Sequence, residues 1–276
     1  MTSSVPKSAA ELGEAIAARQ PGLADTRWHT VDVVDATGST NADLAARAGE
    51  PDLVGTVRIT MNQTAGRGRR ARVWSAPPGA QIAISAVLPV ENQTEALGWL
   101  SLATGVAAAH GIGAATSVKP VLKWPNDVLV DGKKIAGILA EYVATDDGGI
   151  AVVGIGINTE MAADELPVDT ATSLRIESGQ PVDVAAVAVE YLRWLSAIDW
   201  PRDLDGLAEQ YRQVCDTIGR RVRLILPDSE VVGTAVGVDH QGRIVLTADD
   251  GATITADDGA TITAAAGDVV HLRPVQ

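Results

Sequence analysis

The residues of this sequence best suited to chemistry form a cationic stretch at positions 63–75. Arginine is a planar, permanently charged fork that grips carboxylate and phosphate groups, and glycine lets a backbone approach an oxyanion closely. The chain of 276 residues has a formal net charge of −13, and a polyanion would need a broad basic face. The stretch therefore predicts a site for a small anion, with a solvated loop as the alternative. Its four arginines fall within six residues: Arg67, Arg69, Arg70 and Arg72.

A second basic segment lies at residues 119–134 and holds four of the five lysines. It contains a Trp-Pro-Asn-Asp turn, in which Asn126 and Asp127 offer an amide and a carboxylate where a metal–phosphate pair could sit. The dipeptide Asp131-Gly132 between two apolar runs predicts a tight hairpin. An alternative interpretation of the lysines after this turn is that they protect the edge of a strand from pairing with another chain. The four lysines are Lys119, Lys123, Lys133 and Lys134.

Two further groups of polar residues stand at the ends of predicted strands. Ser39-Thr40-Asn41 follows a strand and opens a helix, where hydroxyls act as ordinary caps or orient a polar ligand. Residues 150–158 form an apolar run that contains two glycines and ends at Asn158. Glycines in a buried strand indicate that another group approaches its backbone closely.

The sequence offers no covalent nucleophile. It lacks a Walker A motif, a nucleophile elbow, a Cys-His pair and zinc-ligand spacing. Residues 66–71 formally fit the dinucleotide fingerprint, but the proline-containing stretch that follows cannot continue as a helix. Cys215 has no local base, so we expect it to be a packing residue. These features favour phosphate chemistry carried out by positioning and charge stabilisation.

Periodicity and turn signals predict an α/β domain followed by a small β-barrel. We expect an acidic loop at 159–170 and, from Gly219 onward, only short strands. An exact repeat of TADDGATI, at 247–254 and 255–262, predicts a lengthened hairpin or loop without a function of its own. The predicted helices are 8–19, 41–48, 96–110 (ended by Gly111), 183–195 and 204–214, and the main strands of the first domain are 30–34, 55–61, 80–88, 121–130, 133–141 and 150–158.

Composition excludes several classes of protein. No apolar run is long enough to span a bilayer, so we expect no membrane association, and the single cysteine suits a reducing cytoplasm. The sequence pI near 4.7 argues against general nucleic-acid binding. The roughly 28 residues before the first predicted strand are too few for a three-helix winged-helix DNA-binding domain.

Two long motifs together resemble the biotin protein ligase family, the biotin–[acetyl-CoA-carboxylase] ligases. The first is Gly-Arg-Gly-Arg-Arg-x-Arg-x-Trp at 66–74, and the second is Lys-Trp-Pro-Asn-Asp at 123–127 with Lys-Ile-Ala-Gly-Ile-Leu-x-Glu at 134–141. Ser39-Thr40-Asn41 and Gly-Ile-Gly-Ile-Asn at 154–158 fit the same pattern in the same order. The resemblance covers residues 30–275.

This resemblance implies a mixed sheet flanked by helices, related to the class II aminoacyl-tRNA synthetase core, at residues 1–217. It implies an SH3-like barrel at 218–276. The implied enzyme uses Mg²⁺, adenylates biotin with ATP to biotinyl-5′-AMP, and transfers biotin to a lysine of a biotin carboxyl carrier domain of an acyl-CoA carboxylase. Because this chemistry needs no covalent enzyme intermediate, the lack of a nucleophile is consistent with it.

The resemblance also assigns roles to individual residues. Lys134 is expected to grip the biotin carboxylate and the developing charge on the α-phosphate, with Lys133 as the alternative. Asp127 is expected on the magnesium side, and Arg67 and Arg69 are expected to be catalytic. The expected biotin-binding residues are Ser39, Thr40, Asn41, Gln63, Arg67, Gly68, Arg69 and Lys134, and the expected ATP-binding residues are Arg72, Trp74, which walls the adenine, Asn126 and Asn158.

Three departures and three alternatives accompany this assignment. Ala71 stands where the family usually has glycine, the TADDGATI repeat has no counterpart, and a winged helix is missing, so we expect no DNA-binding repressor. The alternatives are a lipoate or octanoate ligase or transferase, a non-catalytic sensor, and a DNA-binding regulator. Since four like charges repel, residues 65–75 are expected to become ordered only over bound biotinyl-AMP.

Overall fold

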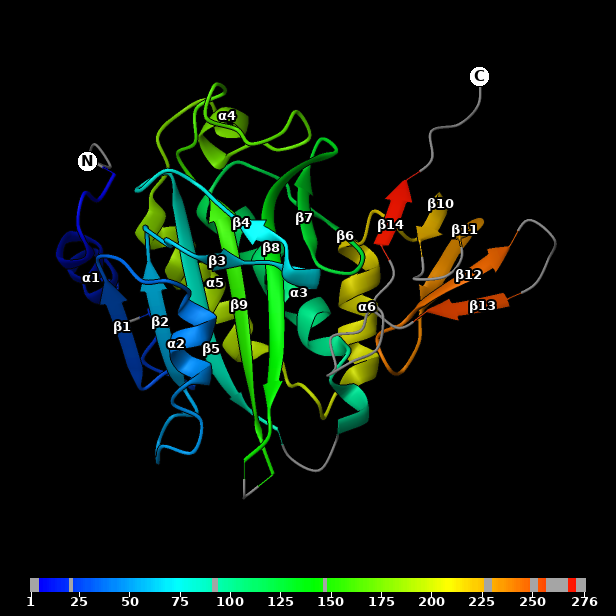
Figure 1. The fold of residues 1–276 in the computed structure, drawn as a ribbon, viewed down its shortest axis with the longest axis horizontal. Helices are drawn as coiled ribbons and strands as arrows, with labels where there is room; N and C mark the ends of the chain where they lie inside the picture. The colour runs from blue at the N-terminus through cyan, green and yellow to red at the C-terminus, as the bar shows by residue number, and fades with distance from the viewer. Residues whose placement is uncertain are drawn as a thin grey trace.

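The computed structural model describes residues 5–19, 22–90, 94–145, 148–225, 230–248, 253–256 and 268–271. Helices and strands alternate through the first part of the chain, and a set of strands alone follows (Figure 1). The helices are α1 (Ala9–Ala17), α2 (Thr40–Ala45), α3 (Trp99–Ala115), α4 (Leu174–Ser178), α5 (Val184–Ala197) and α6 (Leu204–Val214), with short 3₁₀ turns at Arg69–Ala71 and Thr94–Ala96.

A seven-stranded sheet in the order β1-β2-β5-β9-β8-β7-β6 forms the frame of the larger part. Only β1 and β2 are parallel, and every other neighbouring pair in this sheet is antiparallel. Its strands are β1 (Thr30–Val34), β2 (Thr56–Thr60), β5 (Gln81–Pro89), β6 (Val121–Lys123), β7 (Asp127–Val130), β8 (Lys133–Val143) and β9 (Ile150–Asn158), and a separate two-stranded ribbon pairs β3 (Gly66–Arg67) with β4 (Val73–Trp74).

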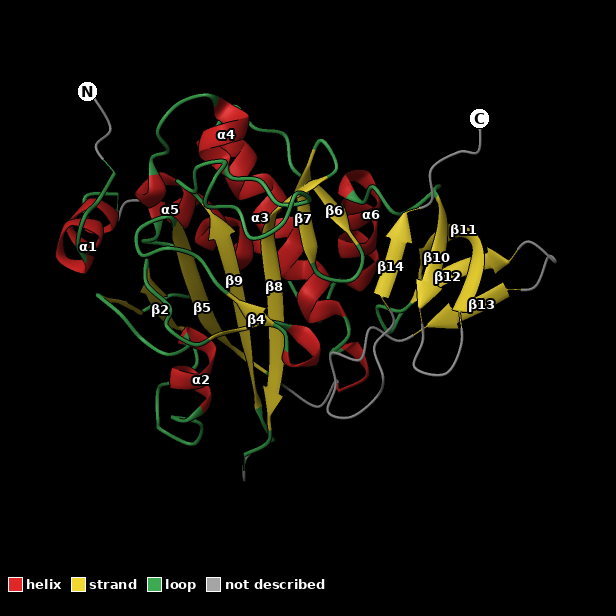
Figure 2. Ribbon diagram, turned by 45° about the horizontal axis from the view of Figure 1, so that its top comes forward, coloured by secondary structure: helices red, strands yellow, loops and turns green. Residues whose placement is uncertain are grey.

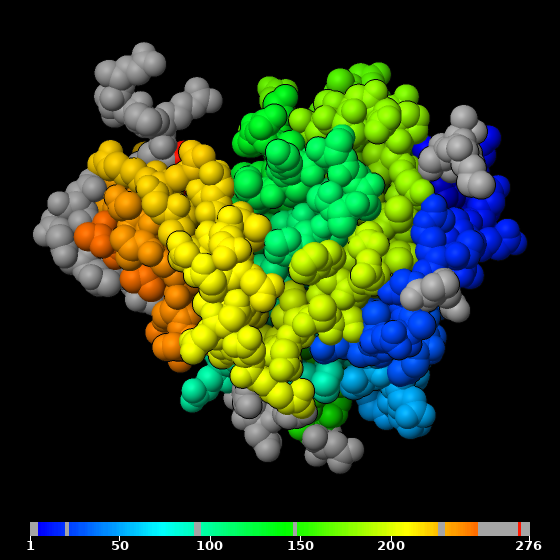
Figure 3. Space-filling view, turned by 180° about the vertical axis from the view of Figure 1, so that it is seen from behind, coloured from blue at the N-terminus to red at the C-terminus, as the bar shows by residue number. Residues whose placement is uncertain are grey.

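Helices cover the two faces of this sheet unequally. α3 and α5 pack on each other behind the sheet, whereas α2 lies on the front against β5 and β9 (Figures 1 and 2). α3 is apolar all round because it is enclosed by the sheet, α5 and α6, and most of its residues are buried. From behind, α5, α6 and the green-cyan segment around residues 100–120 form the outer surface, with the N-terminal segment on one side and the C-terminal strands on the other (Figure 3). The front face is thus left for a site.

The front face carries small and polar residues in rows that cross the sheet. Cross-strand pairing aligns Ala83, Gly156, Gly137 and Asp127, and a neighbouring row aligns Ser85, Gly154 and Leu139. Paired residues point to the same face of a sheet, and residues two apart along a strand share that face. The two rows therefore form one floor, nearly free of bulky side chains over β9, on which other groups can lie.

The predicted fold class is confirmed, and all five predicted helices exist. The Asp131-Gly132 hairpin is also confirmed, with positive φ at both residues and pairing of β7 with β8. The prediction that Gly111 ends its helix is wrong, because α3 continues to Ala115. A methyl group at Gly111 would lie 2.6 Å from the backbone of Tyr191, so this glycine allows α5 to cross closely. The short helix α4, capped by Ser173, was not predicted.

A smaller antiparallel sheet in the order β13-β12-β11-β10-β14 follows from residue 221, as the predicted all-β C-terminal region requires. Most of the second TADDGATI copy lies outside the described residues, so the prediction for the repeat is untested. The domain boundary at 217/218 also stays a prediction. The strands are β10 (Arg221–Ile225), β11 (Glu230–Val238), β12 (Ile244–Ala248), β13 (Thr253–Ala256) and β14 (Asp268–His271).

Two buried indoles dock this smaller sheet on the larger part. Trp124 Nε1 donates to the carbonyl of Gly242 at 3.1 Å, and Trp99 Nε1 donates to the carbonyl of His240 at 3.1 Å. A side chain at Gly242 would collide with the backbone at Gly98 and Trp99, so the turn between β11 and β12 sits tightly against the start of α3. Trp124 begins the turn that carries Asn126 and Asp127, and the docking therefore reaches the edge of the front face.

Candidate active site

A cavity of about 430 Å³ lies on the front face beneath the β3–β4 ribbon. Its walls come from segments far apart in the sequence: the start of α2, the ribbon, the floor strands, the β6–β7 turn and two residues of the smaller sheet, Ile225 and Val270. Of the residues predicted for the site, those that line this cavity are Ser39, Thr40, Asn41, Gln63, Arg67, Gly68, Arg69, Arg72, Trp74, Asn126, Asp127 and Lys134.

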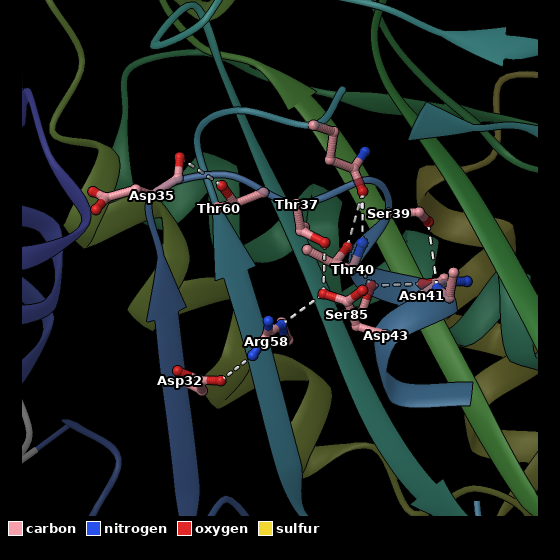
Figure 4. Close-up of polar contacts among 12 residues, drawn as sticks. Asp32, Asp35, Thr37, Ser39, Thr40, Asn41, Asp43, Arg58, Thr60 and Ser85 are labelled. Carbon is pink, nitrogen blue, oxygen red and sulfur yellow. Dashed lines mark hydrogen bonds and ion pairs between the residues drawn. The ribbon is translucent and has the colours of Figure 1, made fainter. Parts of the chain in front are cut away.

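One end of the cavity is a network of uncharged polar groups at the start of α2. The Gln63 side-chain oxygen accepts hydrogen bonds from the Thr40 amide at 2.9 Å and the Thr40 hydroxyl at 3.1 Å. Ser85 Oγ lies 2.7 Å from Thr40 Oγ1 and 2.6 Å from Asn41 Oδ1 (Figure 4). Ser39 caps α2 by accepting from the Ala42 amide. These buried hydroxyls and amides form a rigid set of donors and acceptors suited to a small polar group.

Charged residues behind this network hold α2 in place. Arg58 on β2 donates to Asp43 on α2 at 2.8 Å and also pairs with Asp32 on β1 (Figure 4). The Thr37 hydroxyl donates to the same Asp43 carboxylate at 2.6 Å. Since an isolated helix of six residues is not stable in water, these contacts and the packing of Leu44 fix the position of the capping residues.

Glu141 connects the polar end to the arginine loop. One carboxylate oxygen, Oε2, accepts from Asn41 Nδ2 and from Arg67 Nη2, each at 2.9 Å. Asn41 Nδ2 also donates to the Leu139 carbonyl at 3.0 Å, so the Asn41 amide is committed to protein contacts. A side chain at Gly154 would collide with Asn41. Asn41 therefore lines the cavity mainly as a spacer that fixes its shape.

The arginine loop folds back over the cavity as the β3–β4 ribbon. The Gly68 amide donates to the Arg72 carbonyl at 2.7 Å, and Arg69 reaches Asn126 Oδ1 at 3.4 Å. Ala71 has a φ of 57°, a left-handed conformation that favours glycine. This conformation gives a physical reason for the glycine that the resemblance in the sequence leads us to expect at this position.

The other end of the cavity is strongly charged. Lys134 Nζ lies 2.5 Å from Asp127 Oδ1, and Lys123 Nζ lies 4.0 Å from Asp127 Oδ2. The Lys134 ammonium is also 5.5 Å from the centre of the Trp74 ring. Asp127 and Trp74 thus hold Lys134 at the edge of the floor under the indole. An ammonium fixed there suits a group on which negative charge develops.

The Trp74 indole lies on the bare part of the floor. Methyl groups at Gly137 and Gly156 would come within 3.0 Å and 2.6 Å of its ring atoms, so both glycines are needed for this contact. Its Nε1 donates to Gln81 Oε1 at 2.6 Å. The expectation that something approaches the β9 backbone closely is confirmed, and the approaching groups are Trp74 and Asn41.

A metal ion has limited support from protein atoms alone. No set of three or more His, Cys, Asp or Glu side chains converges to hold a metal within the described ranges. Asp127 supplies a single carboxylate that already faces two ammonium groups. Magnesium is commonly held by one or two carboxylates together with water and substrate phosphates, so Asp127 fits an ion that arrives with a nucleotide.

Asn158 is the predicted site residue that does not line the cavity. It is buried at the end of β9, and its side-chain amide donates to the Thr172 carbonyl at 2.9 Å. Its predicted contact with the nucleotide has no support in this geometry and stays a prediction.

Burial raises the pKa of the Cys215 thiol, in agreement with the predicted packing role.

Sequence reasoning missed several residues of the site. Ser85 and Gln81 lie in an apolar strand. Each is two residues away from Ala83, so both side chains point to the same face of the sheet as Ala83, which is the face of the site. This alternation of polar residues on a buried strand was the available signal. Glu141 is the last residue of the second motif, and its role was not predicted because its partners Asn41 and Arg67 are distant in the sequence.

The fold and the site define a ligase of the class that activates a carboxylic acid for attachment to protein. The biotin/lipoate A/B protein ligase family matches residues 38–158, and the biotin protein ligase C-terminal domain matches residues 217–272. Together with the relatives below, these matches show that the chain belongs to the biotin protein ligase family.

Characterised relatives agree with this assignment. The chain is 44% identical over 258 residues to biotin–[acetyl-CoA-carboxylase] ligase of Mycobacterium tuberculosis, covering 91% of this chain and 92% of the relative. It is 34% identical over 225 residues to the bifunctional ligase/repressor BirA of Escherichia coli, covering 80% of this chain and 70% of the relative.

Solved structures support the fold. Biotin protein ligase from Aquifex aeolicus superposes with a TM-score of 0.69 at 21% identity, covering 89% of this chain and all of that one. A second structure of that enzyme, in complex with biotin and ATP, gives a TM-score of 0.68 at 23% identity, with the same coverage. At these identities the likeness concerns the fold alone.

Proposed function

We propose that this protein is an ATP-dependent biotin–[biotin carboxyl-carrier protein] ligase. The observation that carries the proposal is a single cavity with a neutral polar end and a charged end, where Lys134 lies beside an indole-covered floor, all beneath an arginine ribbon. This order matches a ligand with a polar ring, a carboxylate and a nucleotide. The M. tuberculosis relative at 44% identity, named for this activity, supports the same conclusion.

The polar end is the proposed site for the ureido ring of biotin. A cyclic urea has one carbonyl acceptor and two N–H donors, so it needs both kinds of partner. Ser39, Thr40 and Gln63 provide hydroxyl and amide groups there. Arg67, Gly68 and Arg69 close over the ligand. Asn41 fixes the width of the pocket through its hydrogen bonds with Ser85 and Glu141.

The reaction has two displacement steps. In the first, a biotin carboxylate oxygen attacks the α-phosphorus of ATP, a new P–O bond forms, and pyrophosphate leaves. In the second, the ε-amine of a carrier lysine attacks the acyl carbon of biotinyl-5′-AMP, an amide forms, AMP leaves, and the amine loses a proton. Lys134 orients the carboxylate and stabilises the charge that develops on the phosphoryl group. Arg72 and Arg69 neutralise the remaining phosphate charge.

Magnesium is proposed to enter with ATP, with Asp127 and Asn126 as the protein groups that would hold it. Bound there, it would withdraw negative charge from the phosphates. The ion pair between Lys134 and Asp127 at 2.5 Å keeps the lysine in reach of the same phosphate oxygens.

The proposed protein partner is the biotin carboxyl carrier domain of an acetyl-CoA carboxylase, on the strength of the relative's name. No helix in the described part of the chain is long and apolar enough to cross a membrane. The cytoplasmic location and the absence of DNA binding stay predictions from the sequence.

Mass spectrometry of an added carrier domain tests the whole reaction. With biotin and ATP we expect one biotinyl group on one carrier lysine, and no product when either substrate is omitted. The control reactions replace biotin with octanoate or lipoate. Modification by those acids in place of biotin would contradict the proposal and assign the chain to the lipoate branch of the family.

A further inference from the structure

A row of residues on the front face of the large sheet lies under α2. Its members are paired across β1, β2, β5 and β9 in the order Asp32, Arg58, Ser85 and Gly154. Because Arg58 is paired with Ser85, its side chain points to the same face as the floor of the cavity. Ser85 Oγ lies 2.6 Å from Asn41 Oδ1 at the start of the helix. Further along the helix, Arg58 Nε donates to Asp43 Oδ2 at 2.8 Å, and this contact is the charged one (Figure 4).

The same carboxylate oxygen of Asp43 reaches a second segment, the chain between β1 and α2. It accepts from the Thr37 hydroxyl at 2.6 Å. Thr37 continues the parallel pairing of β1 and β2 beyond the ends of those strands. Its amide donates to the Asn62 carbonyl at 3.1 Å, and its carbonyl accepts from the Thr64 amide at 2.9 Å. Thr37 therefore fixes the backbone on both sides of Gln63.

We propose that Asp43 is a positioning residue for biotin, because its carboxylate sets the separation between Thr40 and Gln63. The inference rests on the proposed ligase function, in which these two side chains bind the ureido ring. Thr40 opens α2, whereas Gln63 leads into the arginine loop, so the two belong to segments that only tertiary contacts can align. Asp43 contacts Arg58, which lies under the helix, and Thr37, which lies beside Gln63.

Asp43 acts on the ligand through other residues. Neither Asp43 nor its partners Arg58 and Thr37 line the cavity. With the carboxylate in place, the Thr40 amide lies 2.9 Å from Gln63 Oε1 before any ligand arrives. Without it, binding itself must bring the two segments into this arrangement, and the cost of that ordering lowers the affinity for biotin.

The fold is expected to survive the loss of Asp43. Arg58 also pairs with Asp32 on β1, so its guanidinium keeps a carboxylate partner when Asp43 is replaced. Leu44 remains as the apolar anchor of α2, since it is buried in a separate cluster with residues of β5 and β9. A substitution at Asp43 therefore changes the placement of the helix without leaving an unpaired charge under it.

The test compares wild type with Asp43→Ala and Asp43→Asn. Calorimetry gives the Kd of biotin, and biotin-dependent exchange of labelled pyrophosphate gives kcat and both KM values. For Asp43→Ala we expect the Kd and the KM of biotin to rise about tenfold, while kcat at saturating biotin and the KM of ATP change less than about twofold. Asp43→Asn keeps an oxygen for Arg58 and Thr37 and should recover most of the affinity. An unchanged Kd in Asp43→Ala, or a fall in kcat alone, would overturn the proposal.

Asp32→Ala is the matched control, because Asp32 pairs with the same guanidinium from the side away from α2 (Figure 4). It should bind biotin within about twofold of wild type. An equal loss in Asp32→Ala and Asp43→Ala would show a general effect of breaking ion pairs and would refute the specific role of Asp43. A wild type that binds no biotin would contradict the ligase function itself, so the two failures are distinguishable.

A double variant tests the route through Thr37. Thr37→Val removes the hydroxyl at nearly constant volume and should weaken biotin binding by itself. Because Asp43→Ala has already broken the same hydrogen bond, the double variant Asp43→Ala/Thr37→Val should bind biotin no more weakly than Asp43→Ala alone. Losses that simply multiply would contradict this route.

Discussion

Single residues in this site serve more than one neighbour. Asp127 pairs with Lys134 and faces Lys123, and Glu141 accepts from Asn41 and Arg67 through one oxygen. A substitution at such a residue releases several groups together.

Backbone strain is concentrated at two residues of the arginine loop. Arg70 and Ala71 both adopt positive φ, a conformation in which an L side chain is strained.

Ala71→Gly is expected to stabilise the closed loop. A left-handed conformation costs a residue with a Cβ about 1–2 kcal/mol, whereas the added freedom of glycine costs about 0.5–1 kcal/mol. The net gain predicts that biotinyl-5′-AMP dissociates roughly two- to fivefold more slowly. Stopped-flow dissociation measures this rate. Ala71→Val, whose branched side chain fits this conformation worse, should dissociate faster than wild type, and identical rates in all three proteins would refute the explanation.

At the scale of elements, the site depends on contacts that hold the short β3–β4 ribbon against the strands of the floor and α2. The floor is part of β5, β9 and β8, and α2 is fixed by Arg58 and Asp43. The β3–β4 ribbon is paired over two residues in each strand and contacts the floor through Trp74 and through Arg67 with Glu141. The carboxylate of Glu141 therefore links the biotin end to loop closure.

Glu141→Gln should loosen the loop while the rest of the fold is unchanged. The variant keeps a polar group for Asn41 but loses the charge that pairs with Arg67, a contact that is partly exposed and therefore contributes about 1 kcal/mol or less. Hydrogen exchange at residues 65–75 is expected to slow when biotin and ATP are added to the wild type, and to slow less in the variant.

Glu50→Gln supplies the comparison, since Glu50 pairs with Arg47 at the same 2.9 Å on the surface. It should exchange like wild type at residues 65–75. Exchange there that ignores ligand in the wild type would show that the loop does not order over the adenylate, and equal protection in Glu141→Gln would remove the link through Glu141.

At the scale of the molecule, the smaller sheet is part of the site. Ile225 and Val270 line the cavity, and Trp124, which begins the turn that carries Asn126 and Asp127, donates to Gly242. His271 Nε2 on β14 lies 3.0 Å from Thr217 Oγ1, and that hydroxyl accepts from the Trp124 amide at 3.0 Å. These contacts run from β14 to the turn that holds Asn126 and Asp127.

His271 predicts that stability depends on pH. Burial, followed by the charge of Lys123, lowers the pKa of His271 from its ordinary value of 6.5, against the opposing effect of Asp216. Well above pH 6.5 the histidine is neutral in both the folded and the unfolded chain. As the pH falls below 6.5, the unfolded chain binds the proton first, so this residue reduces the free energy of unfolding. The urea midpoint of the wild type should therefore fall more steeply below pH 6.5 than that of His271→Gln, and parallel curves would contradict this role.

The sequence was sufficient for the parts that depend on local signals and motifs. Capping residues, the Asp131-Gly132 hairpin and the apolar strands were read correctly, and two motifs located most of the cavity lining. Packing between segments that are distant in the sequence could not be predicted from it. Gly111 looked like a helix end because only the crossing of α5 explains it, and nothing near Gly156 in the sequence indicates Trp74 as its contact. Gln81 acquires its meaning only from the ring beside it.

The most direct test of the account is biotin-dependent exchange of labelled pyrophosphate into ATP, compared between wild type, Lys134→Ala and Lys133→Ala. Lys134 lines the cavity and contacts Asp127, whereas Lys133 is exposed and does not line it. Loss of one charge-stabilising donor should lower the rate of exchange by roughly 10²–10³-fold in Lys134→Ala, while Lys133→Ala stays near wild type. Exchange that does not require biotin, or that survives in Lys134→Ala, would contradict the central claim that Lys134 assists adenylation of biotin in this cavity.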